Sequence, residues 1–277
     1  MAETRHNQLI AEAARRVLTP LGVRQRGRSR IWLDDRGWWL IVIEFQPSSW
    51  ARGTYLNVGA MWLWRQIGHL AFDHGYREEG FQEFRDAADF EAKAAAVAER
   101  AAVEVLRLRA QFADLEAVAR ALGGDAPKDG WGQYHAAIAA ALASDRTAAV
   151  VGLDALATPR SDDPPWLRDL RAWAREIRGL IDRPTELAAY LDAVVRDTRS
   201  ALKLPAFSGS VGDRQHEDEA PNNGEDTAGH LENAVFIKRP IEEVFAFVAD
   251  LPKISLWNYH VRTVTPTSAG TGVVGST

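Results

Sequence analysis

The sequence contains no cysteine. This excludes disulfides, thiolate metal sites and thiol catalysis, and it agrees with a reducing compartment. The chain also lacks a hydrophobic run approaching the roughly 20 residues that a membrane-spanning helix requires. Its N-terminal residues carry charges between their apolar positions, unlike a secretory signal. From these absences we expect a cytoplasmic protein with no membrane partner.

Common patterns of catalytic sites are missing as well. The sequence has no glycine-rich phosphate loop, no nucleophile elbow and no carboxylate pair at a diagnostic spacing. His69, Asp73 and His74 lie close together, but the two histidines are one residue too far apart for a helical His-x-x-x-His zinc site. The sequence therefore predicts no metal, no cofactor and no catalytic residue, so that an enzyme is the less favoured interpretation.

The negative charge of the chain is concentrated in one segment. The formal net charge is -5, yet residues 1–204 hold 28 basic and 28 acidic side chains. Residues 205–232 hold seven acidic side chains and one arginine, with many Gly, Ser and Asn and few large apolar groups. Such a segment buries too little apolar surface to offset its ordering entropy. We expect a disordered acidic linker; a solvated spacer is favoured over an acidic mimic of nucleic acid.

Ahead of this linker, residues 1–204 divide into a strand-rich part and a helical part. Apolar residues at helical spacing predict a first helix over residues 4–18, which Pro20 and Gly22 end. Strand composition follows at residues 23–33, 38–46 and 55–64, with a hairpin turn at residues 34–37. The second strand is apolar on both faces, which predicts a central position in the sheet.

Helical patterns dominate from residue 86 onward. They cover residues 86–122, with a break near 112–114, and then residues 131–142, 146–156, 165–181 and 184–202. Two of these helices begin at a proline, where the missing N–H costs no hydrogen bond. The predicted fold class is α+β, with a small antiparallel sheet packed against a helical bundle.

Three motifs in the strand region point to a known family. They are LGVRQRGRSRIW at residues 21–32, WLIVIEFQPSSW at residues 39–50 and YLNVGAMW at residues 55–62, with Gln46, Asn57 and Gly59 at fixed places relative to the strands. Over roughly residues 5–120 the chain resembles a bacterial family, the domain of unknown function 4304. The resemblance implies no established reaction, so it assigns no catalytic residue.

Arg24, Arg26, Arg28 and Arg30 alternate along the first predicted strand, and Trp32 follows at the same spacing. Alternation places these side chains on one face, as a basic stripe that ends in an aromatic ring. Arginine beside an exposed aromatic ring suits single-stranded nucleic acid. We favour the alternative, an edge strand protected from aggregation by its charge, because residues 1–204 have no net positive charge. We do not expect nucleic acid as a partner.

Gln46 and Asn57 lie near the ends of adjacent predicted strands, with Glu44 close by. Amides in a sheet core must find hydrogen-bond partners. The favoured interpretation is that they hold the loop at residues 47–52. The alternative is a ligand pocket that they line together with three tryptophans, Trp50, Trp62 and Trp64.

The last 45 residues carry a second set of motifs. A short strand at residues 234–237 precedes a helix start at Arg239-Pro240, the apolar-faced helix 241–251, Trp257, and a strand at residues 261–268. This pattern resembles the start of a polyketide cyclase or START-like (SRPBCC) domain. Complete members enclose an apolar ligand between a sheet and a long helix. The matching residues form an incomplete β-α-β segment, which we expect to be too short to enclose a ligand by itself.

These observations favour a non-catalytic binding or regulatory module for an unknown small molecule or protein, fused to a truncated START-like segment. The alternative is a hydrophobic-ligand carrier or polyketide-cyclase-like enzyme whose cavity domain is incomplete in this chain. The expected domains are residues 1–204, the linker 205–232 and the segment 233–277. We expect a monomer or a weak dimer.

Overall fold

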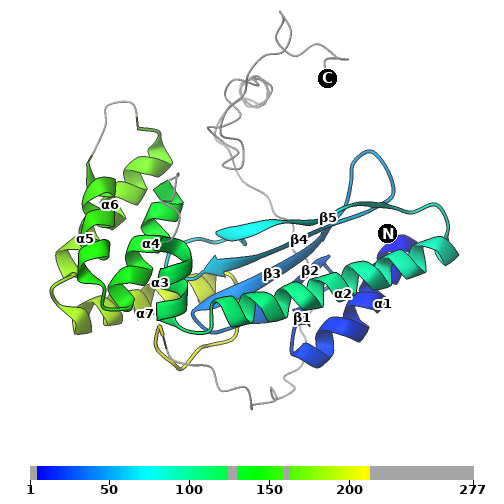
Figure 1. Cartoon of the computed structure of the whole chain (residues 1–277), viewed down its shortest axis with the longest axis horizontal. Coiled ribbons are helices and arrows are strands. Elements are labelled where there is room, and N and C mark those ends of the chain that lie inside the picture. Colours follow the sequence, from blue (N-terminus) through cyan, green and yellow to red (C-terminus); the bar gives the residue numbers. More distant parts are fainter. Residues whose placement is uncertain (1–4, 124–129, 159–162, 213–277) are drawn as a thin grey trace, which may run out of the picture. The chain divides into compact units, whose positions relative to one another are not determined.

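The computed structural model describes residues 5–123, 130–158 and 163–212. All of them belong to Met1–Leu231, the first of the chain's two compact units. The predictions for residues 213–277, which include the START-like segment and most of the acidic linker, lie outside the described residues. Within the described residues the fold is α+β, as the sequence predicts (Figure 1).

The sheet has five antiparallel strands in the order β1-β2-β3-β4-β5. They are β1 (Arg24–Gln25), β2 (Ile31–Asp35), β3 (Trp39–Gln46), β4 (Gly53–Trp62) and β5 (His74–Glu83). The prediction that residues 38–46 form a central strand is confirmed, since β3 pairs with β2 on one side and β4 on the other. Its side chains are buried on both faces from Trp39 to Ile43, which accounts for its nearly continuous apolar sequence.

One prediction about the strands is wrong, and one strand was missed. Residues 23–33 do not form one strand, because a turn interrupts them: Gly27 has φ of 54°, and Arg26 N–H donates to Ile31 O at 2.9 Å. The short strands β1 and β2 therefore form a hairpin. The strand β5 was not predicted, because its sequence is rich in charge and glycine and lacks apolar alternation. It pairs with β4 and has no second neighbour in the sheet.

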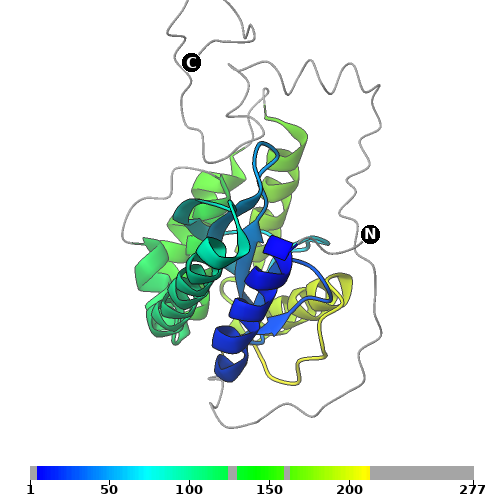
Figure 2. The ribbon, with the colours of Figure 1, turned by 90° about the vertical axis from the view of Figure 1, so that its right-hand side faces the viewer.

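Two adjacent aspartates show how helices cover both faces of the sheet. Asp34 and Asp35 are consecutive in β2, so their side chains point to opposite faces. Asp34 accepts two hydrogen bonds of 2.8 Å from Arg109 of α2 (Ala87–Gln111). Asp35 accepts bonds of 2.7 and 2.8 Å from Arg199 of α7 (Pro184–Ala201). The helices α2 and α7 thus lie on opposite faces, and α1 (Arg5–Leu18) packs beside α2 (Figures 1 and 2).

The remaining helices form an up-and-down bundle at one end of the sheet (Figure 1). They are α3 (Leu115–Gly123), α4 (Gly130–Leu142), α5 (Arg146–Ala157) and α6 (Pro165–Leu180). The predicted break near residues 112–114 is confirmed, because α2 ends at Gln111 and α3 begins at Leu115. None of the helices within the described ranges is long and apolar enough to cross a membrane.

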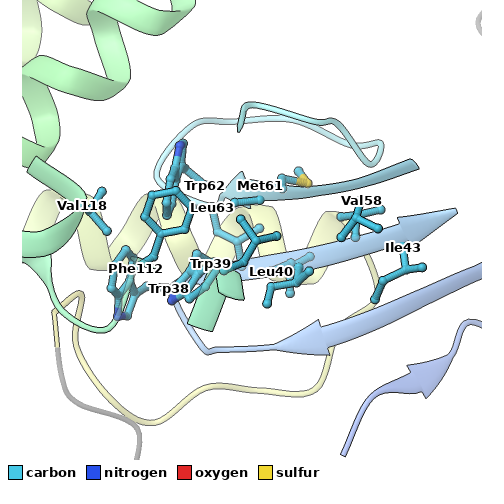
Figure 3. Close-up of a cluster of buried hydrophobic side chains, with 14 of the residues drawn as sticks. Trp38, Trp39, Leu40, Ile43, Val58, Met61, Trp62, Leu63, Phe112 and Val118 are labelled. Carbon is cyan, nitrogen blue, oxygen red and sulfur yellow. The ribbon is translucent and has the colours of Figure 1, made fainter. Parts of the chain in front are cut away.

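A tryptophan cluster joins the sheet to the bundle. Trp38, Trp62 and Trp64 are stacked, with ring centroids 5.2–6.1 Å apart and interplanar angles of 13–16°. Phe112, at the end of α2, meets Trp62 edge-on at 5.0 Å (Figure 3). Such large rings bury 150–250 Å² each, so they dominate the energetics of this junction.

The first residues of the predicted linker differ from the expectation. Arg199 donates to Pro205 O at 2.7 and 3.0 Å, and Val211 N–H donates to Asp192 Oδ1 at 2.7 Å. Residues 205–212 therefore pack on the domain, and its ordered part extends beyond the predicted boundary at residue 204.

Candidate functional site

A groove of about 640 Å³ runs between α3, α4 and α5. Nine of its fourteen lining residues are alanine or glycine, and none of the fourteen is aromatic. The α5 side extends from Asp145 to Ala155, which corresponds to roughly 15 Å along a helix. Val151 stands on this rim with 65% of its surface exposed, although it is the largest aliphatic side chain of the lining. The groove is therefore walled mainly by small side chains that lie close to the helix backbones.

Small side chains also explain why the groove forms here. A Cβ atom added at Gly152 of α5 would lie 2.9 Å from the Cβ of Ala137 on α4. The two helices thus pack closely, and α4 becomes the floor of the groove while α3 and α5 form its rims. Asp145 fixes the start of α5, because its carboxylate accepts from Ala148 N–H at 3.0 Å. Ser144, with φ of 64°, makes the left-handed turn just before it.

The charges of the groove are separated along its length. In the up-and-down arrangement of Figure 1, the start of α3 lies beside the end of α4 and the start of α5. Glu116 and Asp145 therefore sit at one end of the groove, and Arg120 lies one turn of α3 farther along. All three side chains are exposed, and none of them forms an ion pair within the described part of the chain.

A buried polar cluster lies where the sheet meets α4. Asp73 Oδ1 is 3.0 Å from Arg65 Nη1 and 3.5 Å from His135 Nε2. Asp73 Oδ2 accepts from the Trp62 backbone N–H at 2.8 Å. Trp64 Nε1 donates to His135 Nδ1 at 2.9 Å. Burial acts to raise the pKa of Asp73, but His135, Arg65 and the Trp62 N–H outweigh it and hold the pKa below its ordinary value.

This polar cluster is suited to structure rather than to catalysis. An indole N–H can only donate, so Nδ1 of His135 acts as acceptor and the ring proton of the neutral form is on Nε2, facing Asp73. A catalytic Asp–His pair needs a nucleophile on its second nitrogen, and here Trp64 occupies that nitrogen. Arg65 also stacks on Trp131 of α4 at 4.3 Å, and its backbone O accepts from Thr198 of α7 at 2.7 Å. The cluster ties β4, α4 and α7 together.

The amides singled out from the sequence contact each other rather than the loop at residues 47–52. Asn57 Nδ2 donates to Glu44 Oε2 at 2.9 Å and to Gln46 Oε1 at 3.1 Å. Gln46 Oε1 also accepts from Arg77 of β5 at 2.5 Å, a partner that sequence reasoning missed because β5 was not predicted. Arg77 in turn stacks on Tyr55 at 4.0 Å. These groups form a half-exposed polar network across β3, β4 and β5.

The three tryptophans of the alternative pocket are not brought together. Trp62 and Trp64 are fully buried in the stacked cluster, whereas Trp50 lies on the β3–β4 connection with 94% of its surface exposed. A pocket shared by Trp50, Trp62, Trp64 and the two amides is therefore not formed. Trp62 and Trp64 belong to the core, and their position explains the burial of the polar cluster beside them.

The predicted arginine stripe is not formed either. The turn between β1 and β2 separates Arg24 from the later arginines, so they do not share one strand face. Arg26 donates to Leu202 O at 3.2 Å. Arg30 reaches Phe45 O at 3.3 Å and also contacts Asn7 of α1.

Two further members of the predicted stripe also lack the proposed role. Trp32 is buried, with 2% of its surface exposed, so it offers no platform for a base. Arg28 lies in the turn, outside both strands. The arginines that are bonded act as structural ties between the hairpin, the sheet and the helices.

The histidines near Asp73 do not assemble a metal site. His74 starts β5 and meets Phe112 edge-on at 5.1 Å, while Asp73 is committed to the polar cluster. Over residues 5–123, 130–158 and 163–212, no group of three potential His, Asp or Glu ligands has a geometry that would hold a metal ion.

Comparisons with known proteins add no relative. No family model, no curated protein and no solved structure matches the chain. The resemblances to the domain of unknown function 4304 and to START-like domains remain predictions from the sequence.

Proposed function

We propose that this protein is a non-catalytic interaction module whose groove between α3, α4 and α5 binds an amphipathic helix of a protein partner. The observation that carries this proposal is the open, alanine-lined groove between two helical rims. Helix-in-groove recognition places large apolar side chains of one helix between the helices of its partner. Small lining side chains leave room for that insertion, and helices then approach to about 8–10 Å between their axes.

The lining favours a helix over a small molecule. Pockets for small molecules are mainly lined by hydrophobic and aromatic side chains with a few convergent polar groups. This groove has no aromatic lining residue, and its charges lie spread along α3 and at the start of α5. A bound helix can contact α3, α4 and α5 along the whole groove, whereas a small molecule would contact only part of it. The groove is long enough for about three turns of helix.

Val151 provides the first test of this proposal. We expect the change Val151→Lys to weaken binding of a docked helix at least about tenfold, because a buried ammonium group would replace an apolar contact at the rim. A yeast-displayed library of amphipathic helices, sorted on labelled wild-type protein, supplies the binders. The measurement is the affinity of enriched clones for the wild-type protein and for the variant.

The matched control is Val103→Lys on the exposed face of α2, where the side chain is 54% exposed. This variant carries the same chemical change outside the groove, so it should bind the enriched helices as the wild type does. Enriched clones that bind the Val151→Lys variant with unchanged affinity would contradict the proposal, as would a library from which no helix is enriched.

A further inference from the structure

The charged side chains of the groove constrain the charge pattern and the direction of a helix that binds there. Glu116 and Asp145 mark one end, and Arg120 lies one turn of α3 farther along. Each is exposed, and none is neutralised by an ion pair within the described residues. A helix that lies in the groove must place its own side chains beside these three charges. Like charges placed side by side suppress wrong partners and wrong orientations, so the order of the charges carries information.

We infer that the partner helix is acidic near its N-terminus and basic near its C-terminus, and that it runs from Arg120 toward Glu116 and Asp145. This inference rests on the proposed function and names the chemistry and direction of its partner. The acidic residues would lie beside Arg120, and the basic residues beside the two carboxylates.

The dipole of the partner helix supports the same order. Acidic side chains are stabilising in the first turn of a helix and basic side chains in the last turn. A helix with this order is therefore stabilised both internally and by the groove, whereas the opposite order conflicts with both. In the inferred direction the helix is antiparallel to the two rims, α3 and α5, and parallel to the floor, α4, as the up-and-down order of the bundle in Figure 1 shows. Antiparallel neighbours are the usual arrangement of such bundles.

The library sorted on the wild-type protein tests this inference directly. The library is built with acidic and basic residues allowed equally at both ends of the displayed helix. We expect enriched clones to carry acidic residues in the first turn and basic residues in the last. We also expect a synthetic peptide with the enriched sequence to bind about tenfold more tightly than one with its terminal charges exchanged.

A charge exchange within the protein provides the matched variant. In the double variant Glu116→Arg/Arg120→Glu, the net charge and the composition of α3 are unchanged, but the charges along the groove are reversed on that rim. The preference between the two peptides should fall to about threefold or less, or reverse. Glu91→Arg on α2, outside the groove, should leave the tenfold preference intact.

The possible outcomes separate this inference from the proposed function. Enriched helices without charge order, whose binding is still lost in Val151→Lys, would overturn the inference and leave the proposed function standing. Binding that ignores Val151→Lys would overturn both. The groove could instead be occupied by a second copy of this chain, which sedimentation velocity on the protein alone tests. A dimer that Val151→Lys converts to a monomer would assign the groove to that second copy and would overturn the proposal of a partner helix.

Discussion

The change Asp73→Asn should lower the free energy of unfolding by about 3–5 kcal/mol, because it leaves the buried Arg65 guanidinium without its counter-ion. Both side chains are almost fully buried, at 3% and 8% exposure. Asparagine preserves the size of the side chain and can still accept the Trp62 N–H, so the loss reports the charge rather than packing. Urea denaturation at pH 7 measures the effect.

Two comparisons separate this effect from a general cost of aspartate substitution. Asp182→Asn removes the partner of Arg146, an exposed pair with both side chains 62% accessible, and should leave the midpoint unchanged within error. Adding Arg65→Met to Asp73→Asn should recover part of the lost stability, because no unpaired cation then remains buried. Equal losses in Asp73→Asn and Asp182→Asn would contradict the assigned role of the cluster.

The same carboxylate predicts a pH dependence of stability. The pKa of Asp73 in the folded protein is lowered from 3.8, so the folded state favours the ionised form. Its stabilising contribution is therefore present above the unfolded pKa of 3.8 and is lost as the pH falls through the lower folded value. The difference in urea midpoint between wild type and Asp73→Asn should be full at pH 7 and shrink progressively below pH 3.8. A difference that persists unchanged at pH 2 would contradict this assignment.

Much of the fold follows from local sequence patterns. The α-helices could be placed from the spacing of apolar residues, proline starts and glycine stops, and their observed bounds differ from the prediction by few residues. The central strand β3 was predictable because its apolar residues occupy both alternating positions. These features depend on neighbours within one element, which is why the sequence alone carries them.

The errors arise where tertiary context decides. The arginine-rich residues 24–30 alternate like a strand, but Gly27 allows a turn there, and β2 pairs with β1 as a hairpin. The strand β5 has little intrinsic strand character and is held by pairing with β4. Because β5 was missed, its Arg77 was missed as the partner of Gln46.

The groove is also a property of tertiary packing. Alanine-rich helices such as α4 and α5 carry small side chains on several faces, so their sequences do not indicate which face remains open. The close contact between Gly152 and Ala137 places α5 against one side of α4. The helix α3 packs on another side of α4. The pairing of His135 with Asp73 could not be predicted from the sequence either, because 62 positions separate the two residues.

A substitution in the tryptophan cluster should have the second large effect on the free energy of unfolding. The change Trp62→Ala should lower the free energy of unfolding by about 3–5 kcal/mol, because it leaves a cavity between stacked rings that cannot collapse freely. Trp62 is fully buried and contacts the rings of Trp38, Trp64 and Phe112. Chemical denaturation followed by far-ultraviolet circular dichroism measures the loss without depending on tryptophan fluorescence.

Trp50→Ala is the matched control, since the same side chain is removed from a position 94% exposed and should change stability by less than about 0.5 kcal/mol. Trp62→Phe distinguishes ring packing from polar contacts. The indole N–H of Trp62 is buried and has no hydrogen-bond partner within the described residues, so its removal relieves a desolvation cost. Phenylalanine should therefore destabilise much less than alanine. Equal losses for the two variants would contradict the assignment of the effect to ring packing.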